Sequence, residues 1–224
     1  MPIAPGSRVG KYEVRTLLGQ GGFGMVFMGH DTALDRDCAL KFLLPEHTSR
    51  PEILQRFLKE ARSAAKIKHG GIVTVFECGT VEGAGPPLDG MAYIAMELLE
   101  GESLSDRVKR GPMPVEHALE ITRQVASALA AAHAVGIIHR DLKPDNIYLV
   151  PDPATTFGER VKVLDFGIAK LADDTGGNAA KTSTHMIFGT PKYMSPEQCK
   201  STAKVDERSD IYALGCILFE MVCG

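Results

Sequence analysis

The stretch HRDLKPDN at His139–Asn146, followed downstream by DFG at Asp165–Gly167, decides the fold. The second motif comes after a β-type run and before a long polar segment. Phosphoryl transfer needs a carboxylate to orient the attacking hydroxyl and oxygen ligands to hold magnesium between phosphates. Asp141, Asn146 and Asp165 supply those groups in this pattern, so the stretch predicts phosphoryl-transfer chemistry.

A glycine-rich segment near the N-terminus fits the same chemistry. The segment matches the pattern Gly19-x-Gly21-x-x-Gly24-x-Val26. Because glycine has no Cβ atom, the backbone N–H groups of such a segment can approach phosphate oxygens closely. The pattern alone is weak, and it also fits an ordinary hairpin turn. A dinucleotide-binding version would be followed by a helix, whereas the strand-forming run Met25–Met28 follows here. The order of elements therefore favours a flap over nucleotide phosphates.

Lys41 is a candidate ligand for those phosphates. It ends the run Ala39-Leu40-Lys41 inside an apolar strand, where a lysine is costly unless its charge is used. Glu60 is the best candidate partner, because it shares the apolar face of the next predicted helix with Phe57. In isolation, Glu60 also reads as an ordinary solvated carboxylate.

The first half of the chain predicts a small sheet with one helix. β-type runs cover Tyr12–Leu18, Met25–Met28, Cys38–Leu43, Ile72–Cys78 and Met91–Leu98. Apolar residues at helical spacing predict a helix from Pro51 through Lys68. The Gly/Pro-rich segment Glu82–Gly90 predicts a long hairpin loop.

The second half predicts mainly helices. The expected elements are a helix over Val115–Ala134 that ends at Gly136, strands at Ile147–Val150 and Val161–Leu164, and a helix over Asp210–Cys223. That last helix is apolar almost all round, which is the pattern of a helix buried on every side. The long polar segment Asp173–Thr184 predicts a functional lid or loop.

Composition excludes several classes of protein. A net charge of -3 and a pI near 6.2 give no basic excess for nucleic acid. No run approaches the ~20 apolar residues of a membrane span, and the first residues lack a signal-peptide pattern. The five cysteines are odd in number and never in C-x-x-C spacing, which favours reduced thiols. We therefore expect a cytoplasmic segment without membrane or nucleic-acid contact.

Together these motifs resemble the protein kinase family, and the set includes Ser195-Pro196-Glu197. The phrases Gly136–Asp141, Asp165–Lys170 and Ser195–Gln198 are most similar to bacterial eukaryotic-like serine/threonine kinases. The resemblance implies an α+β, bilobal kinase fold. Residues 1–99 would form an N-lobe with a five-stranded antiparallel sheet and one main helix, and residues 100–224 a mostly helical, incomplete C-lobe.

The resemblance also implies roles for individual residues, with ATP and Mg²⁺ as cofactors. Lys41, paired with Glu60, would hold the α- and β-phosphates, Asp141 would orient the substrate hydroxyl, and Asn146 and Asp165 would bind the metal. The implied nucleotide contacts are Leu18, Gly19, Gly21, Gly24, Val26, Ala39, Met96, Glu97, Leu99 and Tyr148. Of these, Tyr148 departs from the family's usual aliphatic residue.

Other residues bear on specificity and regulation. By the resemblance, Lys143 and Thr190 indicate the serine/threonine class. Lys143 would support the γ-phosphate, and the hydroxyl of Thr190 would bond near the catalytic Asp and Lys. The segments Gly189–Pro191 and Ser195–Glu197 resemble a platform for peptide substrates. Thr182 and Thr184 are expected autophosphorylation sites, because a phosphate there could pair with Arg140.

Three further residues receive structural interpretations. The resemblance makes His139 a packing residue beneath Phe166. Asp210, at the start of the last predicted helix, would cap that helix, and by the resemblance it would hold the catalytic-loop backbone. His133, in an alanine-rich helix, is interpreted as a packing histidine.

Two alternatives stay open at this point. A pseudokinase-like binding module, or an inactive truncated kinase, would keep the fold and lose the chemistry, although none of the expected catalytic residues is missing. A small-molecule kinase is the other alternative. Because the family usually continues through more helices, we expect residues 1–224 alone to transfer phosphate poorly and to self-associate through exposed apolar surface.

Overall fold

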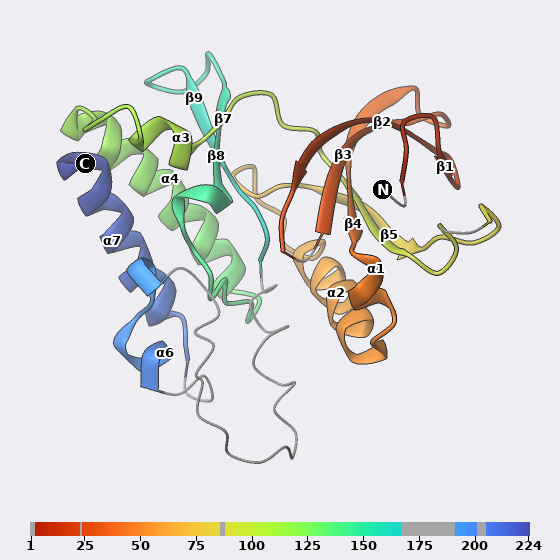
Figure 1. Ribbon diagram of the computed structural model, residues 1–224. Coiled ribbons are helices and arrows are strands. Elements are labelled where there is room, and N and C mark those ends of the chain that lie inside the picture. Colours follow the sequence, from red (N-terminus) through yellow and green to blue (C-terminus); the bar gives the residue numbers. More distant parts are fainter. Residues whose placement is uncertain (1–2, 23, 86–87, 167–190, 201–204) are drawn as a thin grey trace. The chain divides into compact units, whose positions relative to one another are not determined.

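The structure is a computed structural model that describes residues 3–22, 24–85, 88–166, 191–200 and 205–224. Within these ranges the side chains of Glu60 and Lys200 are not described. The chain divides into two compact units, shown in Figure 1. The first unit comprises residues 1–65 and 74–99, and the second comprises residues 66–73 and 100–224.

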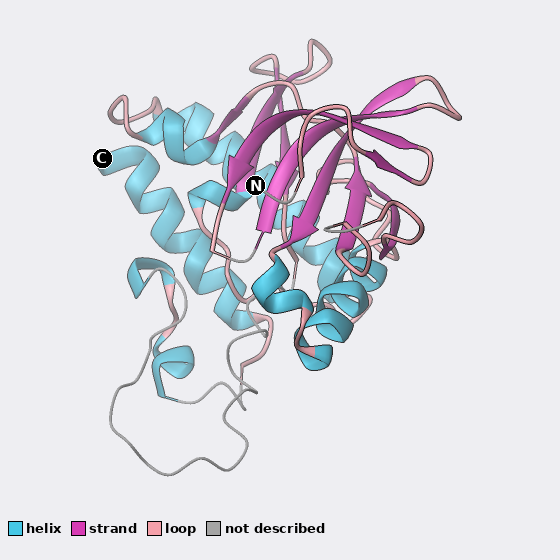
Figure 2. Ribbon diagram, turned by 45° about the vertical axis from the view of Figure 1, so that its right-hand side comes forward, coloured by secondary structure: helices cyan, strands magenta, loops and turns pink. Residues whose placement is uncertain are grey.

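The first unit contains a six-stranded antiparallel sheet, drawn as arrows in Figure 2. Its strands are β1 (Arg8–Val9), β2 (Tyr12–Gln20), β3 (Gly24–Asp31), β4 (Arg36–Leu43), β5 (Val75–Thr80) and β6 (Ala92–Met96), in the order β1-β2-β3-β4-β6-β5. The five expected strands are present. The expected count of five was wrong, because the two-residue β1 adds an edge strand against β2.

Buried and partly buried residues alternate along the strands, and the buried ones form the core of this unit. The buried residues of β3 include Met25 and Phe27, while Val26 and Met28, which alternate with them along the strand, are only partly buried. The rings of Phe27 and Phe42 meet edge to face at 5.9 Å, and the rings of Tyr12 and Tyr93 do so at 6.0 Å. Aromatic pairs at this separation add to the free energy gained from burial.

Two short helical segments follow β4. They are α1 (Pro45–Thr48) and α2 (Pro51–Ala64), and α2 buries Ile53, Phe57 and Ala61. The expected start at Pro51 is confirmed, but the expected end at Lys68 was wrong. The chain leaves the helix because residues 66–73 join the second unit, where Val73 N–H donates to Val163 and Val163 N–H donates to Gly71.

The second unit combines a small sheet with helices. Its elements are β7 (Glu102–Ser103), α3 (Leu104–Val108), α4 (Val115–His133), η1 (Pro144–Asn146), β8 (Ile147–Pro151), β9 (Glu159–Val163), η3 (Pro191–Tyr193), α6 (Pro196–Lys200) and α7 (Arg208–Cys223). The strands pair antiparallel in the order β7-β8-β9. After α4, Gly136 takes a φ of 73°, and Ile137 N–H returns to the carbonyl of Ala132. This is the glycine stop that the sequence predicted.

Helices α4 and α7 pack against each other in this unit. The buried face of α7 contains Ala213, Leu214, Ile217 and Met221. Its opposite face exposes Ile211, Tyr212 and Phe219, which is apolar surface of the kind that the sequence analysis expected to be exposed. Among the described residues, no helix combines the length and hydrophobicity that a bilayer crossing requires.

Candidate active site

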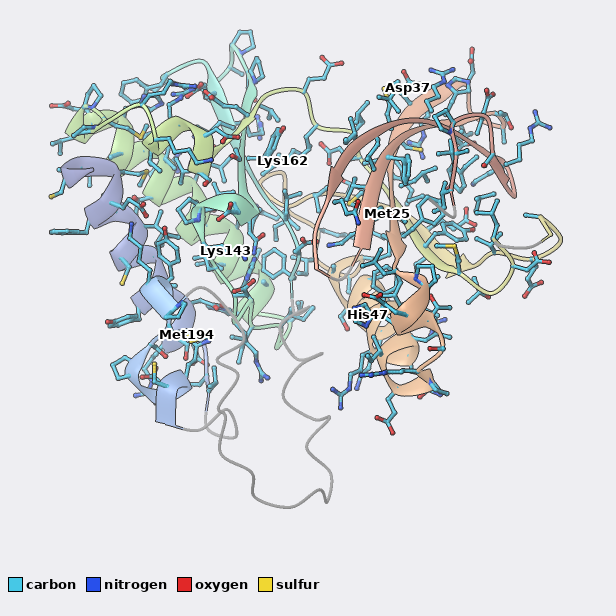
Figure 3. All side chains as sticks on the ribbon, in the orientation of Figure 1. Met25, Asp37, His47, Lys143, Lys162 and Met194 are labelled. Carbon is cyan, nitrogen blue, oxygen red and sulfur yellow. The ribbon has the colours of Figure 1, made fainter. Side chains whose placement is uncertain are left out.

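The catalytic stretch forms the connection between α4 and β8, where Figure 3 labels Lys143. The Nζ of Lys143 lies 3.3 Å from Oδ2 of Asp141, and both side chains are partly exposed. Asn146 closes the loop from inside, because its Nδ2 donates to the carbonyl of Asp141 at 2.8 Å and its N–H donates to Lys143 at 2.9 Å. The sequence-predicted Asp141, Lys143 and Asn146 therefore come together.

Arg140, directly before Asp141, has an unusual backbone. Its φ is 68°, in the left-handed region that non-glycine residues rarely adopt. Its N–H donates to Oδ1 of Asp210 at 2.8 Å, and its carbonyl accepts from Nε2 of Gln198 at 2.7 Å. A strained backbone of this kind persists only where its surroundings fix it, as these two contacts do.

Asp210, the third residue of α7, is buried and holds the catalytic loop. One oxygen accepts the N–H of Arg140, and the other accepts the N–H of His139 at 2.9 Å. The Nε2 of His133 lies 2.8 Å from that second oxygen. The expected contact of Asp210 with the catalytic-loop backbone is confirmed, but the expected helix cap is wrong, because the N-terminus of α7 has no side-chain cap bond. His133, interpreted as a packing histidine, also makes this polar contact between two helices.

The segment around Asp165 is joined to the same loop. Leu164 N–H donates to the carbonyl of Asn146 at 2.9 Å, and Nε2 of His139 lies 2.8 Å from the carbonyl of Leu164. The rings of His139 and Phe166 lie 4.8 Å apart, which confirms the expected packing. Asp165 itself has a φ of 55°, a second left-handed residue beside the loop.

A small hollow opens beside the carboxylate of Asp141. It is lined by Arg140, Asp141, Leu142, Tyr193, Met194, Gln198, Ser209, Asp210 and Ala213. Figure 3 labels Met194, which follows η3 and precedes α6. The lining therefore combines the catalytic loop, the segment before α6, α6 itself and the first two turns of α7.

The segment that precedes α6 is anchored on α7. Tyr193 O–H and Lys192 Nζ both donate to the carboxylate of Glu220. Burial, followed by the contact with Glu220, raises the pKa of the Tyr193 hydroxyl, so it stays a donor. Glu197 is partly exposed and accepts a hydrogen bond from Ser209 at 3.2 Å.

Several expected nucleotide contacts share one face of the sheet in the first unit. Val26 pairs with Lys41 across β3 and β4, and Ala39 pairs with Met96 across β4 and β6. Directly paired residues, and residues two apart in one strand, point to the same face. The register therefore gathers Val26, Ala39, Lys41 and Met96 on one face.

The glycine-rich turn divides into positions with different constraints. A Cβ on Gly24 would lie 2.5 Å from the carbonyl oxygen of Phe42, so this position requires glycine. Gly19 and Gly21 have open space where a Cβ would be, and Leu18 beside them is exposed. Both glycines are exposed, and the N–H of Gly21 donates to the carbonyl of Gly24 at 2.9 Å.

The remaining expected contacts lie elsewhere. Glu97 makes two hydrogen bonds with Thr74. The N–H of Glu97 donates to the carbonyl of Thr74, and the carboxylate of Glu97 accepts the N–H of Thr74. Leu99 ends the first unit. Tyr148 belongs to the second unit, on β8 opposite Ser103 and Lys162.

Some sequence-predicted residues lie outside the described part of the chain. These are Thr182, Thr184 and Thr190, together with the side chain of Glu60. Conversely, the sequence analysis missed Gln198 and the pair Tyr193–Glu220, because contacts between residues so far apart leave no periodic signal. No group of three or more His, Cys, Asp or Glu side chains suited to a metal occurs among the described residues.

Comparison with known proteins gives a consistent result. The family model for the protein kinase domain matches residues 12–224. The chain is 40% identical over 215 residues to serine/threonine-protein kinase pkn3 of Myxococcus xanthus, covering 96% of this chain and 38% of that protein. It is 42% identical over 216 residues to serine/threonine-protein kinase PknB of Mycobacterium leprae, covering 96% of this chain and 32% of that protein. The chain thus spans about a third of the length of these relatives.

Solved structures agree with the sequence comparisons. The PknI kinase domain of Mycobacterium tuberculosis superposes with a TM-score of 0.73 at 29% identity, covering 98% of this chain and 77% of that chain. A second crystal structure of that domain, a double mutant, gives 0.74 at 28% identity, covering 99% of this chain and 76% of that chain. The matching family model and these relatives show that the chain belongs to the protein kinase domain family, in its bacterial serine/threonine branch.

Proposed function

We propose that this protein transfers the γ-phosphate of ATP to serine and threonine hydroxyls of protein substrates. The observation that carries the proposal is the pair Asp141–Lys143, 3.3 Å apart on a loop that Asp210 and Asn146 hold from inside. Kinase catalysis depends on positioning and electrostatic stabilisation more than on covalent chemistry. A carboxylate and an ammonium held side by side supply both.

Asp141 accepts the proton of the substrate hydroxyl as that oxygen attacks the γ-phosphorus. The ammonium of Lys143 stabilises the negative charge on the transferred phosphoryl group. Both side chains reach solvent in part, so a substrate hydroxyl can approach them. The proposal also gives Thr190 a supporting contact with this pair.

The donor chemistry of Asn146 and Asp165 fits a divalent metal, which we propose to be Mg²⁺. Magnesium is usually held by one or two protein oxygens together with substrate phosphates and water. The Nδ2 of Asn146 is bonded to Asp141, which leaves the amide oxygen as the ligating atom. When bound, the metal neutralises charge that develops on the phosphate oxygens.

The first unit supplies the nucleotide site in this proposal. Val26 and Ala39 contact adenine from the sheet face, Met96 borders it, and the backbone over residues 97–99 meets its edge. Lys41, on that same face, binds the α- and β-phosphates and pairs with Glu60. Leu18 and the glycines at positions 19, 21 and 24 cover the phosphates. Tyr148, which belongs to the second unit, is also assigned an adenine contact by the family resemblance.

Regulation by autophosphorylation forms part of the proposal. A phosphate on Thr182 or Thr184 adds a charge that the guanidinium of Arg140 can pair with. Arg140 precedes the catalytic carboxylate, so this pairing couples the modified segment to the active site. Phosphopeptide mapping of active enzyme tests the assignment, and finding both threonines unmodified would contradict it.

Replacement of one carboxylate tests the main proposal. Asp141→Asn keeps the size of the side chain and removes its basicity, so phosphorylation of serine and threonine peptides should fall by a factor of at least about 10³. The affinity for ATP should stay within about threefold, because Asp141 contacts the acceptor. Turnover near the wild-type rate would contradict the assignment. A wild-type chain that phosphorylates only small molecules, or that binds ATP without transfer, would support the alternatives instead.

A further inference from the structure

Gln198 makes a contact for which the proposed chemistry has no role. It lies in α6, 58 residues beyond the catalytic loop, and its Nε2 donates to the carbonyl of Arg140 at 2.7 Å. Its other side-chain atom, Oε1, accepts the N–H of Ser195 at 3.0 Å. One partly buried amide therefore joins the segment before α6 to the catalytic loop.

The carbonyl of Arg140 belongs to the peptide group that leads into Asp141. The residue has a φ of 68°, which costs energy for arginine, so this peptide does not hold its orientation by intrinsic preference. Asp210 fixes the N–H of Arg140, and Gln198 fixes its carbonyl. A rotation of the peptide would swing the carboxylate of Asp141 away from Lys143.

We propose that Gln198 is a positioning residue that holds the Arg140–Asp141 peptide, and with it the catalytic carboxylate, in the productive orientation. The inference rests on the proposed role of Asp141. Gln198 does not touch the reacting atoms and acts through the backbone. Because its own anchor is Ser195, the catalytic base is set in place only when the segment around Ser195 is docked. The orientation of Asp141 therefore depends on the docking of that segment.

Gln124 offers a matched control in the same unit. Its Oε1 accepts the N–H of Val161 at 2.9 Å, and its Nε2 donates to the carbonyl of Glu159 at 3.2 Å. It bridges α4 and β9, away from Asp141. Gln124→Met and Gln198→Met thus remove the same kind of side-chain amide. Gln124 is distant from the catalytic carboxylate, whereas Gln198 is hydrogen-bonded to the residue directly before it.

Kinetics on the full chain is the first arm of the test. Gln198→Met should lower kcat by about 10- to 100-fold, because small misplacements of catalytic groups cost rates of this order. The KM for ATP should change by less than about twofold, since the nucleotide site is not involved. Gln124→Met should leave kcat unchanged. A Gln198→Met enzyme with wild-type kcat would overturn the proposal.

Gln198→Glu gives a readout that a purely structural role would not show. The ionised carboxylate can still accept the Ser195 N–H, but it cannot donate to the Arg140 carbonyl. The protonated form can donate, so the rate relative to wild type should rise as pH falls from about 8 to about 6. A rate ratio that is constant with pH would count against the hydrogen bond. This variant also decides the matter if the methionine variant fails to fold.

Amide hydrogen exchange separates this inference from the proposed function. Exchange over residues 139–142 should accelerate in Gln198→Met and not in Gln124→Met, whether or not the chain transfers phosphate. If wild type transfers no phosphate, the proposed function fails and the exchange arm alone decides whether Gln198 holds the peptide. If Asp141→Asn is inactive while Gln198→Met matches wild type in rate and exchange, only the present inference fails.

Discussion

The carboxylate of Asp210 lies 2.8 Å from Nε2 of His133, and the same carboxylate accepts the N–H groups of His139 and Arg140. Asp210 is in the first turn of α7, and His133 is the last residue of α4. One buried carboxylate therefore joins two helices to the backbone of the catalytic loop. This arrangement leads to the first prediction.

Asp210→Ala should destabilise the protein by about 3 kcal/mol, because it leaves two N–H groups and a histidine without their acceptor. It should also abolish transfer, since the strained Arg140 loses one of its two anchors. Asp206→Ala is the control, because Asp206 pairs with Arg208 at the surface and should change little. Urea unfolding measures both variants. Equal midpoints for the two variants would contradict this account.

Tyr193 and Glu220 give the second prediction. The Tyr193 hydroxyl donates to Glu220 from a buried position, so Tyr193→Phe should cost about 1–2 kcal/mol. Because Tyr193 lines the hollow beside Asp141, the KM for a peptide substrate should rise as well. Tyr212→Phe, at an exposed tyrosine, should alter neither quantity. Thermal unfolding and peptide kinetics distinguish the two variants, and identical behaviour would remove the anchoring role.

Glu102 gives a prediction about pH. Hydrogen bonds from Arg110, and next from Arg107, lower the pKa of this carboxyl from 4.5 to about 2. A carboxyl whose pKa is lower in the folded state contributes stability above its unfolded pKa, and this contribution disappears as pH falls through the folded value. Glu102→Gln should therefore be less stable than wild type at pH values above 4.5, and this difference should shrink as pH falls toward about 2.

Denaturant unfolding at several pH values measures that difference. The control is Glu82→Gln, at an exposed glutamate for which no strong partner is described. Its difference from wild type should be small. A Glu102→Gln penalty that grows as the solution becomes more acidic would have the wrong sign for the ion pairs with Arg107 and Arg110.

The sequence predicted the parts of the fold that have local patterns. The loop His139–Asn146 and the strands around the glycine-rich turn were found because motif spacing and alternation are visible over a few residues. The edge strand β1 is two residues long and carries no such pattern. Helix α2 stops four residues before the expected end, since residues 66–73 bond to Val163 instead of continuing the helix.

The contacts that fix the active site were harder to predict. His133 and Asp210 are 77 residues apart, and Gln198 and Arg140 are 58 apart. Single polar residues at such separations look like ordinary surface or packing residues until the fold brings them together. The positive φ of Arg140 is likewise invisible in the sequence, because arginine has no preference for it.

The outer face of α7, formed by Ile211, Tyr212 and Phe219, gives the last prediction. These residues lie on one side of the helix, and the Phe219 side chain is 69% exposed. We expect the 224-residue chain to self-associate through this face, and Phe219→Ser should lower the apparent mass in sedimentation velocity without lowering stability. Ile217→Ala on the buried face should instead cost about 2–4 kcal/mol and leave association unchanged. If Phe219→Ser associates as wild type does, another surface holds the copies together. If it unfolds as readily as Ile217→Ala, Phe219 packs against a partner and is not exposed in solution.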